Sequence, residues 1–241
     1  MAKRKQRANG TVKERAKEKE VDKKGEGGYR VKNKINLSAK TLNQKELFKS
    51  IKNNIITIVY GPPGTGKTMI SVASALNSFF KCHYGKIIFT RPCIEAEGEN
   101  LGFLPGDLNE KISPYMIPIF DFLSEYMEKS QIERMVVDGK IITMPLAFLR
   151  GVTFKNSFVL LDEAQNTTPK QMRMFLTRIG EDCKIVMTGD PNQSDIRATN
   201  GLVDVITRLD GIPDIGIVKF DQEDVVRHEI VKIIEKRYDG V

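Results

Sequence analysis

The sequence GPPGTGKT occupies residues 61–68 and decides the fold around it. It is a complete G-x-x-x-x-G-K-T loop, whose glycines turn the backbone so that successive N–H groups point into one concavity. The β-branched and aromatic run NIITIVY (54–60) precedes it as a buried strand should, and a helical pattern follows from Lys67. Backbone amides and the positive end of that helix suit a phosphate. The octet in this strand–loop–helix context predicts that the chain binds a nucleoside triphosphate.

The loop residues divide into backbone and side-chain roles. We expect Lys67 to place its charge across the β and γ oxygens of the nucleotide, and the Thr68 hydroxyl to ligate Mg²⁺. The predicted nucleotide-binding residues are Gly61, Pro62, Pro63, Gly64, Thr65, Gly66, Lys67 and Thr68. Gln44 lies 17 residues before Gly61 in a helical pattern. Its amide is expected to pair with N6 and N7 of adenine and select ATP, although a glutamine on a helix is ordinarily a surface residue.

Two later strands also end in polar residues. The run SFVLLDEAQN (157–166) contains an apolar strand that ends in Asp162 and Glu163, which we assign to Mg²⁺ and to the attacking water. A helix N-cap is the alternative role for such acidic residues. The run KIVMTGDPNQSD (184–195) presents Gln193, whose amide suits a sensor of the γ-phosphate. Its G-D-P-N segment is equally typical of a turn.

Helical and β-prone segments alternate along the chain. The expected helices are 41–52, 67–80, about 107–129, 168–179, 202–209 and about 222–237, and the expected strands are 54–60, 86–90, 157–162, 184–189 and 215–220. This alternation predicts an α/β fold with a largely parallel sheet flanked by helices. The run RMVVDGKIITM (134–144) interrupts it, because two β-prone stretches around Asp138-Gly139 predict a small β-hairpin insertion.

Charge is distributed unevenly over the 241 residues. Residues 1–34 contain 13 Lys/Arg and 5 Asp/Glu, so the other 207 hold 38 − 13 = 25 basic and 31 − 5 = 26 acidic residues. The first segment also has few large apolar residues, so we expect a mostly disordered basic arm at 1–34 and one folded domain at 35–241. Such an arm suits the phosphates of nucleic acid, although a solvated tail without a partner has the same composition.

Cysteine and histidine usage argues against a disulfide framework and against zinc. The three cysteines are scattered with no C-x-x-C spacing, and the chain has two histidines. No apolar run approaches the roughly 18 residues of a membrane span, and the basic N-terminus is not followed by an apolar signal region. We expect a cytoplasmic protein with no membrane partner.

Together these motifs resemble the PhoH-like ATPases, whose nucleotide core is similar to one RecA-like domain of superfamily-one helicases. The resemblance covers about residues 38–238, and its most specific stretches are 91–123, LAFLRG (146–151), DEAQNTTPKQMRMFLTRIG (162–180) and DVVRHEIV (224–231). It implies a P-loop NTPase fold, ATP and Mg²⁺ as cofactors, ATP hydrolysis, and links to phosphate starvation and RNA. The sequence has no room for the nuclease or RNA-binding domain of some members, so we do not expect nuclease activity.

A helicase-like second domain is also absent, which affects the expected mechanism. Charge on the transferred phosphoryl group usually needs an arginine from another domain or subunit. We expect Arg227 or Arg178 to act in trans, within a homo-oligomer such as a hexameric ring, with RNA or single-stranded DNA as partner. Thr90-Arg91-Pro92 lies where related helicases contact the phosphates of a single strand, and the alternative is that Arg91 stabilises its own loop. A slow nucleotide-gated switch acting on a partner is the alternative, and a small-molecule kinase is a weaker one.

Overall fold

The computed structural model describes residues 28–32, 35, 38–92, 108–196, 199–227 and 229–238, with the backbone alone at 108–116, 232, 235, 236 and 238. A six-stranded sheet in the order β3-β2-β4-β5-β1-β6 forms its centre, and each neighbouring pair is parallel. The strands are β1 (Ile56–Tyr60), β2 (Lys86–Arg91), β3 (Ile141–Pro145), β4 (Ser157–Leu161), β5 (Cys183–Gly189) and β6 (Ile215–Lys219). The predicted α/β fold with a parallel sheet is confirmed.

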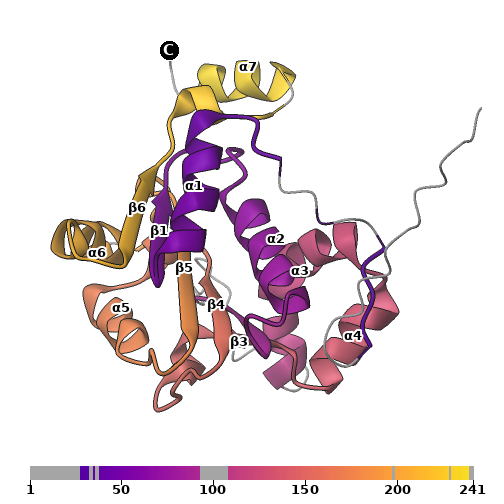
Figure 1. Cartoon of the computed structure of the whole chain (residues 1–241). Helices are drawn as coiled ribbons and strands as arrows, with labels where there is room; N and C mark the ends of the chain where they lie inside the picture. Colours follow the sequence, from indigo (N-terminus) through magenta and orange to yellow (C-terminus); the bar gives the residue numbers. More distant parts are fainter. Residues whose placement is uncertain are drawn as a thin grey trace, which may run out of the picture.

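Helices cover both faces of the sheet (Figure 1). The helices are α1 (Leu42–Asn53), α2 (Lys67–Phe80), α3 (Leu108–Tyr126), α4 (Lys129–Val137), α5 (Pro169–Leu176), α6 (Gly201–Leu209) and α7 (Glu229–Tyr238). Short 3₁₀ turns are η2 (Leu146–Leu149), η3 (Ala164–Asn166) and η4 (Gln222–Asp224). Helices α1 to α4 pack on one face, and α5, α6 and η2 pack on the other. Among the described helices, none is long and apolar enough to cross a membrane.

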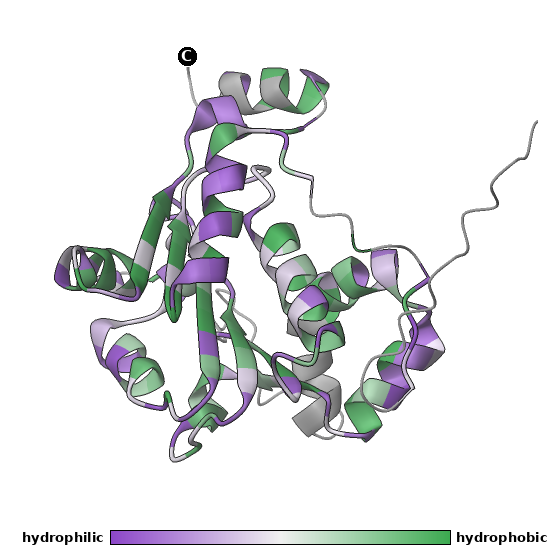
Figure 2. Cartoon of the chain, viewed as in Figure 1, coloured by the Kyte–Doolittle hydropathy of each residue, from purple (hydrophilic) through white to green (hydrophobic). Residues whose placement is uncertain are grey.

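Strand β4 shows why the sheet is apolar throughout. All five of its residues are buried. Phe158 and Leu160 point into the core under α1 to α4, while Val159 and Leu161 point into the core under α5 and α6. Parallel strands covered on both faces need apolar side chains at successive positions, and Figure 2 shows green strands between helices of mixed colour. The ends of these strands are therefore where polar chemistry can be placed.

The predicted β-hairpin at 134–144 is wrong. Residues up to Val137 belong to α4, and β3 pairs parallel with β2 as an edge strand of the main sheet. Asp138 and Gly139 form the end of the helix: Gly139 has φ +66°, and the Lys140 N–H donates to the Met135 carbonyl over 2.8 Å. A glycine with positive φ serves a helix C-terminus as well as a hairpin turn. Burial of Ile132 and Met135 on one face of α4 stabilises the helical alternative.

The folded domain begins before residue 35, within the segment predicted as a basic arm. Tyr29 is only 1% exposed, and its ring lies 6.2 Å from that of Phe79. The Arg134 guanidinium lies 5.2 Å from the Tyr29 ring centroid, and the Tyr29 hydroxyl donates to Asp138. A buried aromatic with these partners anchors residues 28–32 to α2 and α4. Residues 1–27, 33 and 34 of the predicted arm lie outside the described residues.

Candidate nucleotide-binding site

The phosphate loop joins β1 to α2, as the sequence predicts. Two of its glycines are needed for close approach as well as for positive φ. Gly61 has φ +142°, and a Cβ there would overlap the Phe220 carbonyl at the end of β6. Gly64 has φ +75°, and a Cβ there would overlap the Arg227 side chain. The segment that follows β6 therefore covers the loop: a side chain at Gly61 would displace its backbone, and a side chain at Gly64 would displace the Arg227 side chain.

Lys67 lies inside the loop at the first turn of α2. It is 9% exposed, and its Nζ donates to the Gly61 and Pro62 carbonyls over 2.7 and 2.6 Å. Burial lowers the pKa of Lys67, while the carboxylates of Asp190, Glu163 and Asp162 act in the opposite direction. A buried ammonium whose partners are mostly neutral carbonyls is placed to gain from a bound phosphate.

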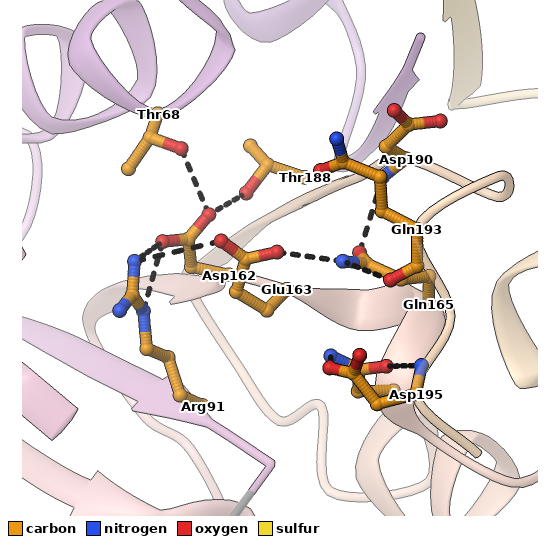
Figure 3. Close-up of polar contacts among 10 residues, drawn as sticks. Thr68, Arg91, Asp162, Glu163, Gln165, Thr188, Asp190, Gln193 and Asp195 are labelled. Carbon is orange, nitrogen blue, oxygen red and sulfur yellow. Dashed lines mark hydrogen bonds and ion pairs between the residues drawn. The ribbon is translucent and has the colours of Figure 1, made fainter. Parts of the chain in front are cut away.

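Asp162 is the centre of a polar cluster behind the loop (Figure 3). Its side chain is 3% exposed, and its Oδ1 accepts hydrogen bonds from Thr68 over 2.8 Å and from Thr188. Its Oδ2 accepts from Nε of Arg91 over 2.9 Å and from Nη2 of the same guanidinium. Strands β2, β4 and β5 are neighbours, so three strand ends and the phosphate loop meet at this carboxylate.

The donor set of this cluster fits Mg²⁺. Thr68 and Asp162 present oxygen atoms side by side next to the phosphate loop, and Mg²⁺ prefers a few protein oxygens together with phosphate oxygens. Among the described residues, no group of three or more His, Cys, Asp or Glu side chains could hold a metal by itself. The arrangement suits a metal that is bound together with the nucleotide.

Glu163 follows Asp162 in a left-handed conformation, with φ +55°. A non-glycine residue in this region is strained by about 1–3 kcal/mol, and such strain tends to occur at functional sites. Its carboxylate accepts a 2.6 Å hydrogen bond from Nε2 of Gln165. Unlike Asp162, the Glu163 side chain is 46% exposed, so it faces the open part of the site.

Gln165 is a site residue that the sequence analysis missed. It is 1% exposed, and its amide also accepts from the Asp190 N–H over 3.1 Å and donates to the Gln193 carbonyl over 3.4 Å. Gln165 therefore joins Glu163, after β4, to the segment after β5 that carries Gln193. In the sequence, Gln165 stands out only because it follows Glu163 by two residues in the D-E-A-Q run. Its contacts with the segment after β5 depend on the pairing of β4 with β5.

One cavity of about 580 Å³ gathers most of the predicted residues. Its lining includes Gln44, Gly64, Gly66, Lys67, Thr68, Asp162, Glu163, Gln193 and Arg227. Gln44 enters it with an amide that is already bonded within the chain: Nε2 donates to the Thr65 carbonyl over 3.0 Å, and Oε1 accepts from the Lys40 N–H over 2.7 Å. This arrangement supports the loop, and adenine recognition by Gln44 stays a prediction.

The three arginines singled out from the sequence fall in different places. Arg227 lies over Gly64 of its own chain and lines the nucleotide cavity, and its action on a neighbouring subunit stays a prediction. Arg178 lies at the opposite, amino edge of the sheet, where its carbonyl accepts from the Phe154 N–H ahead of β4. Arg91, expected to contact a nucleic-acid strand, lines the nucleotide cavity and is ion-paired with Asp162.

Comparison with known proteins gives the family. The model of a family described as "PhoH-like protein" matches residues 36–239. The "PhoH-like protein" of Bacillus subtilis (strain 168) is 45% identical over 205 residues, which are 84% of this chain and 64% of that protein. The "Protein PhoH" of Escherichia coli (strain K12) is 40% identical over 188 residues, 76% of this chain and 53% of that protein. This chain thus spans little more than half to about two thirds of these relatives.

A solved structure supports the fold. The large terminase of a thermophilic bacteriophage superposes with a TM-score of 0.50 at 12% identity, over 83% of this chain and 50% of that one. The architecture is therefore shared with a protein of very different sequence, and the sequence match in turn covers nearly the whole described domain. The chain belongs to the PhoH-like protein family.

Proposed function

We propose that this chain hydrolyses ATP with Mg²⁺. The observation that carries the proposal is that Lys67, Thr68, Asp162, Glu163 and Gln193, from separate segments of the chain, line one cavity of about 580 Å³. In the sequence these residues are spread from position 67 to position 193. Their convergence on one cavity is what phosphoryl transfer requires, because such catalysis consists mostly of positioning and of neutralising charge.

Each side chain then has a defined task. Lys67 would leave the carbonyls of Gly61 and Pro62 to bind the β and γ oxygens, and Thr68 with Asp162 would hold Mg²⁺. The metal, when bound, supplies positive charge against the phosphate oxygens. Glu163 accepts a proton from the attacking water, and Gln165 fixes the orientation of that carboxylate.

We further propose that turnover is coupled to RNA or single-stranded DNA in an oligomer. The basic arm supports the nucleic-acid partner, since residues 1–34 carry a net +8 while the rest of the chain carries −1. Arg178 is half-buried at the edge opposite the nucleotide cavity of its own chain, so any phosphate that it contacts during turnover would belong to a second subunit. A head-to-tail arrangement of this kind closes into a ring when the rotation permits.

The first test compares Lys67→Ala with Glu163→Gln in phosphate release and in binding of a non-hydrolysable ATP analogue. Lys67→Ala should weaken both. Glu163→Gln should bind the analogue normally and turn over about 10²–10⁴ times more slowly, the usual contribution of a general base. Glu133→Gln is the control, since Glu133 is exposed on α4 and pairs only with Lys129 among the described residues. Wild-type turnover by Glu163→Gln would show that Glu163 does not handle the water.

A slow nucleotide-gated switch is the second candidate. The observation in its favour is that Arg91 holds Asp162 through two hydrogen bonds, so the site contains an internal cation beside the metal-binding carboxylate. A switch would hydrolyse slowly with or without polynucleotide, whereas a coupled ATPase would be accelerated by it. Measuring phosphate release with and without added RNA and single-stranded DNA separates the two.

A further inference from the structure

A second, larger cavity lies between α1 and α2, away from the nucleotide site. Its volume is about 770 Å³, and none of its lining residues also lines the nucleotide cavity. Lys45, Phe48 and Lys52 form one wall, three and four residues apart on one side of α1. The other wall is the side of α2 that carries Ser74 and Ser78, with Lys81 at its end. His83 and Tyr84, in the turn before β2, and Lys184 of β5 close the base.

The cavity concentrates positive charge in a domain that is otherwise balanced. Residues 35–241 contain 25 Lys/Arg and 26 Asp/Glu, yet the described lining of this cavity has four lysines and no carboxylate. Among described residues, Lys45, Lys52 and Lys81 make no ion pair and are exposed. Three lysines facing one hollow without a counter-charge raise the local potential for an anion.

Lys184 has a different role from the other three lysines. Its Nζ donates to the carbonyls of Ile51, Lys52 over 3.2 Å and Asn54 over 2.7 Å, at the end of α1. Burial lowers the pKa of Lys184, so this ammonium has lost hydration. All three N–H groups of the Lys184 ammonium donate to carbonyls at the end of α1, so Lys184 forms the base of the cavity and has no donor left for a ligand. The lysines available to a ligand are Lys45, Lys52 and Lys81.

Aromatic rings accompany this charge. Phe48 and Tyr84 are half-buried in the wall, and the Tyr84 ring is fixed edge-on against Phe158 with centroids 6.0 Å apart. Burial is the main cause that raises the pKa of Tyr84, and the nearby charges of Cys183 and Asp182, which do not line the cavity, raise it further. A flat ring stacks on aromatic side chains, while lysines neutralise phosphate.

We propose that this cavity binds the phosphate and base of a nucleotide, either free or as one unit of a single strand. The class of ligand follows from the combination: lysines without counter-charge for phosphate, half-buried rings for a base, and a volume within the range of small-ligand pockets. The base of the site lies at the amino ends of β2 and β5, whereas the phosphate loop follows the carboxyl end of β1. Binding of a single strand at this cavity rests on the proposed function, whereas binding of a free nucleotide does not depend on it.

The absence of tryptophan from the chain permits a local reporter. Phe48→Trp places the only indole in the cavity wall, and Phe148→Trp, at an exposed position on η2, is the matched control. Adenosine monophosphate and a short single-stranded oligoribonucleotide are titrated separately, without ATP. Saturable quenching of the Phe48→Trp variant by the monophosphate assigns a free nucleotide, and quenching by the oligoribonucleotide alone assigns a strand. Fluorescence of the Phe148→Trp variant should respond to neither.

The contribution of charge is tested with two double variants. Lys45→Gln with Lys81→Gln removes two lysines of the cavity, and Lys129→Gln with Lys170→Gln, the control, removes two exposed lysines outside it. The first pair should weaken the quenching and reduce the log–log salt slope for the oligoribonucleotide by about 1.4, at about 0.7 per lysine. The second pair should change neither. Anisotropy with labelled ligands on chains that keep Phe48 gives the same comparison if Phe48→Trp fails to fold. Equal effects of the two lysine pairs, or no binding at the cavity by either ligand, would overturn the proposal, whatever the ATPase assay shows.

Discussion

The ion pair between Arg91 and Asp162 makes a quantitative prediction about stability. Replacement Arg91→Met keeps most of the apolar stem and leaves Asp162, whose side chain is 3% exposed, without its guanidinium. Removing one partner of a buried pair costs about 3–5 kcal/mol. Thr68 and Thr188 would still donate to Asp162, and the Arg91 side chain is 16% exposed, so the low end applies. We expect a loss of about 3 kcal/mol in the free energy of unfolding.

A double-mutant cycle tests this value. Circular dichroism in urea is measured for Arg91→Met, Asp162→Asn and the double variant, without nucleotide or metal. We expect a coupling energy of about 2 kcal/mol or more, since the double variant removes both charges together. The control cycle uses Arg208 and Asp204, which lie 2.8 Å apart but are 73% and 22% exposed, and should give about 0.3–0.5 kcal/mol. Equal coupling in the two cycles would refute the argument that burial makes the Arg91 pair strong.

Three further predictions concern the rest of the domain. Gln165→Leu removes the hydrogen-bond donor to Glu163, which is worth about 1.5–3 kcal/mol for a charged hydrogen bond. Phosphate release should therefore slow about 10- to 100-fold, while binding of the ATP analogue is unchanged. Weakened binding of the analogue would contradict a positioning role for Gln165. Deletion of residues 1–27 should lower the salt slope for single strands by about 0.7 per lost contact without changing the urea midpoint, whereas deletion of 1–34 should also lower the midpoint because it removes Tyr29. Burial raises the pKa of Asp224, but hydrogen bonds from Asn43 and Thr41 outweigh this effect and hold the pKa below its usual value. The difference in free energy of unfolding between the wild type and Asp224→Asn, measured in urea, should therefore be constant above about pH 4 and shrink at lower pH.

The parts of the site that lie on one continuous motif were predictable from the sequence. The octet at 61–68 and the Asp162–Glu163 pair have fixed local contexts, a buried strand followed by a polar turn, and the structure brings residues of both to one cavity. Gln165 and Arg91 could not be assigned in the same way. Their roles depend on which strands are neighbours, and the order β2-β4-β5 is set by packing of the whole sheet. Arg91 meets Asp162 only because β2 pairs with β4.

The error at 134–144 has a different cause, because local sequence there permits two structures. Val136 and Val137 favour a strand, and Asp138-Gly139 favours a hairpin turn. The same glycine can also end a helix. The helix forms because Ile132 and Met135, three residues apart, lie on one face of a helix and are buried together there. The energy that decides is burial against α3 and β3, and this is absent from any short window of the sequence.

The phosphate loop is held by chain segments on both sides of the core motifs. From one side, Gln44 of α1 donates to the Thr65 carbonyl. From the other, the Val226 N–H donates to the Gly64 carbonyl over 3.0 Å, and the adjoining Arg227 side chain covers Gly64. Asn43 donates to Asp224 over 2.7 Å and so ties the two segments to each other. A loop rich in glycine has little intrinsic preference for one shape, and these external bonds select it. The family match from 36 to 239 includes both segments, and the geometry gives the physical reason why they belong to the same functional unit as the octet itself.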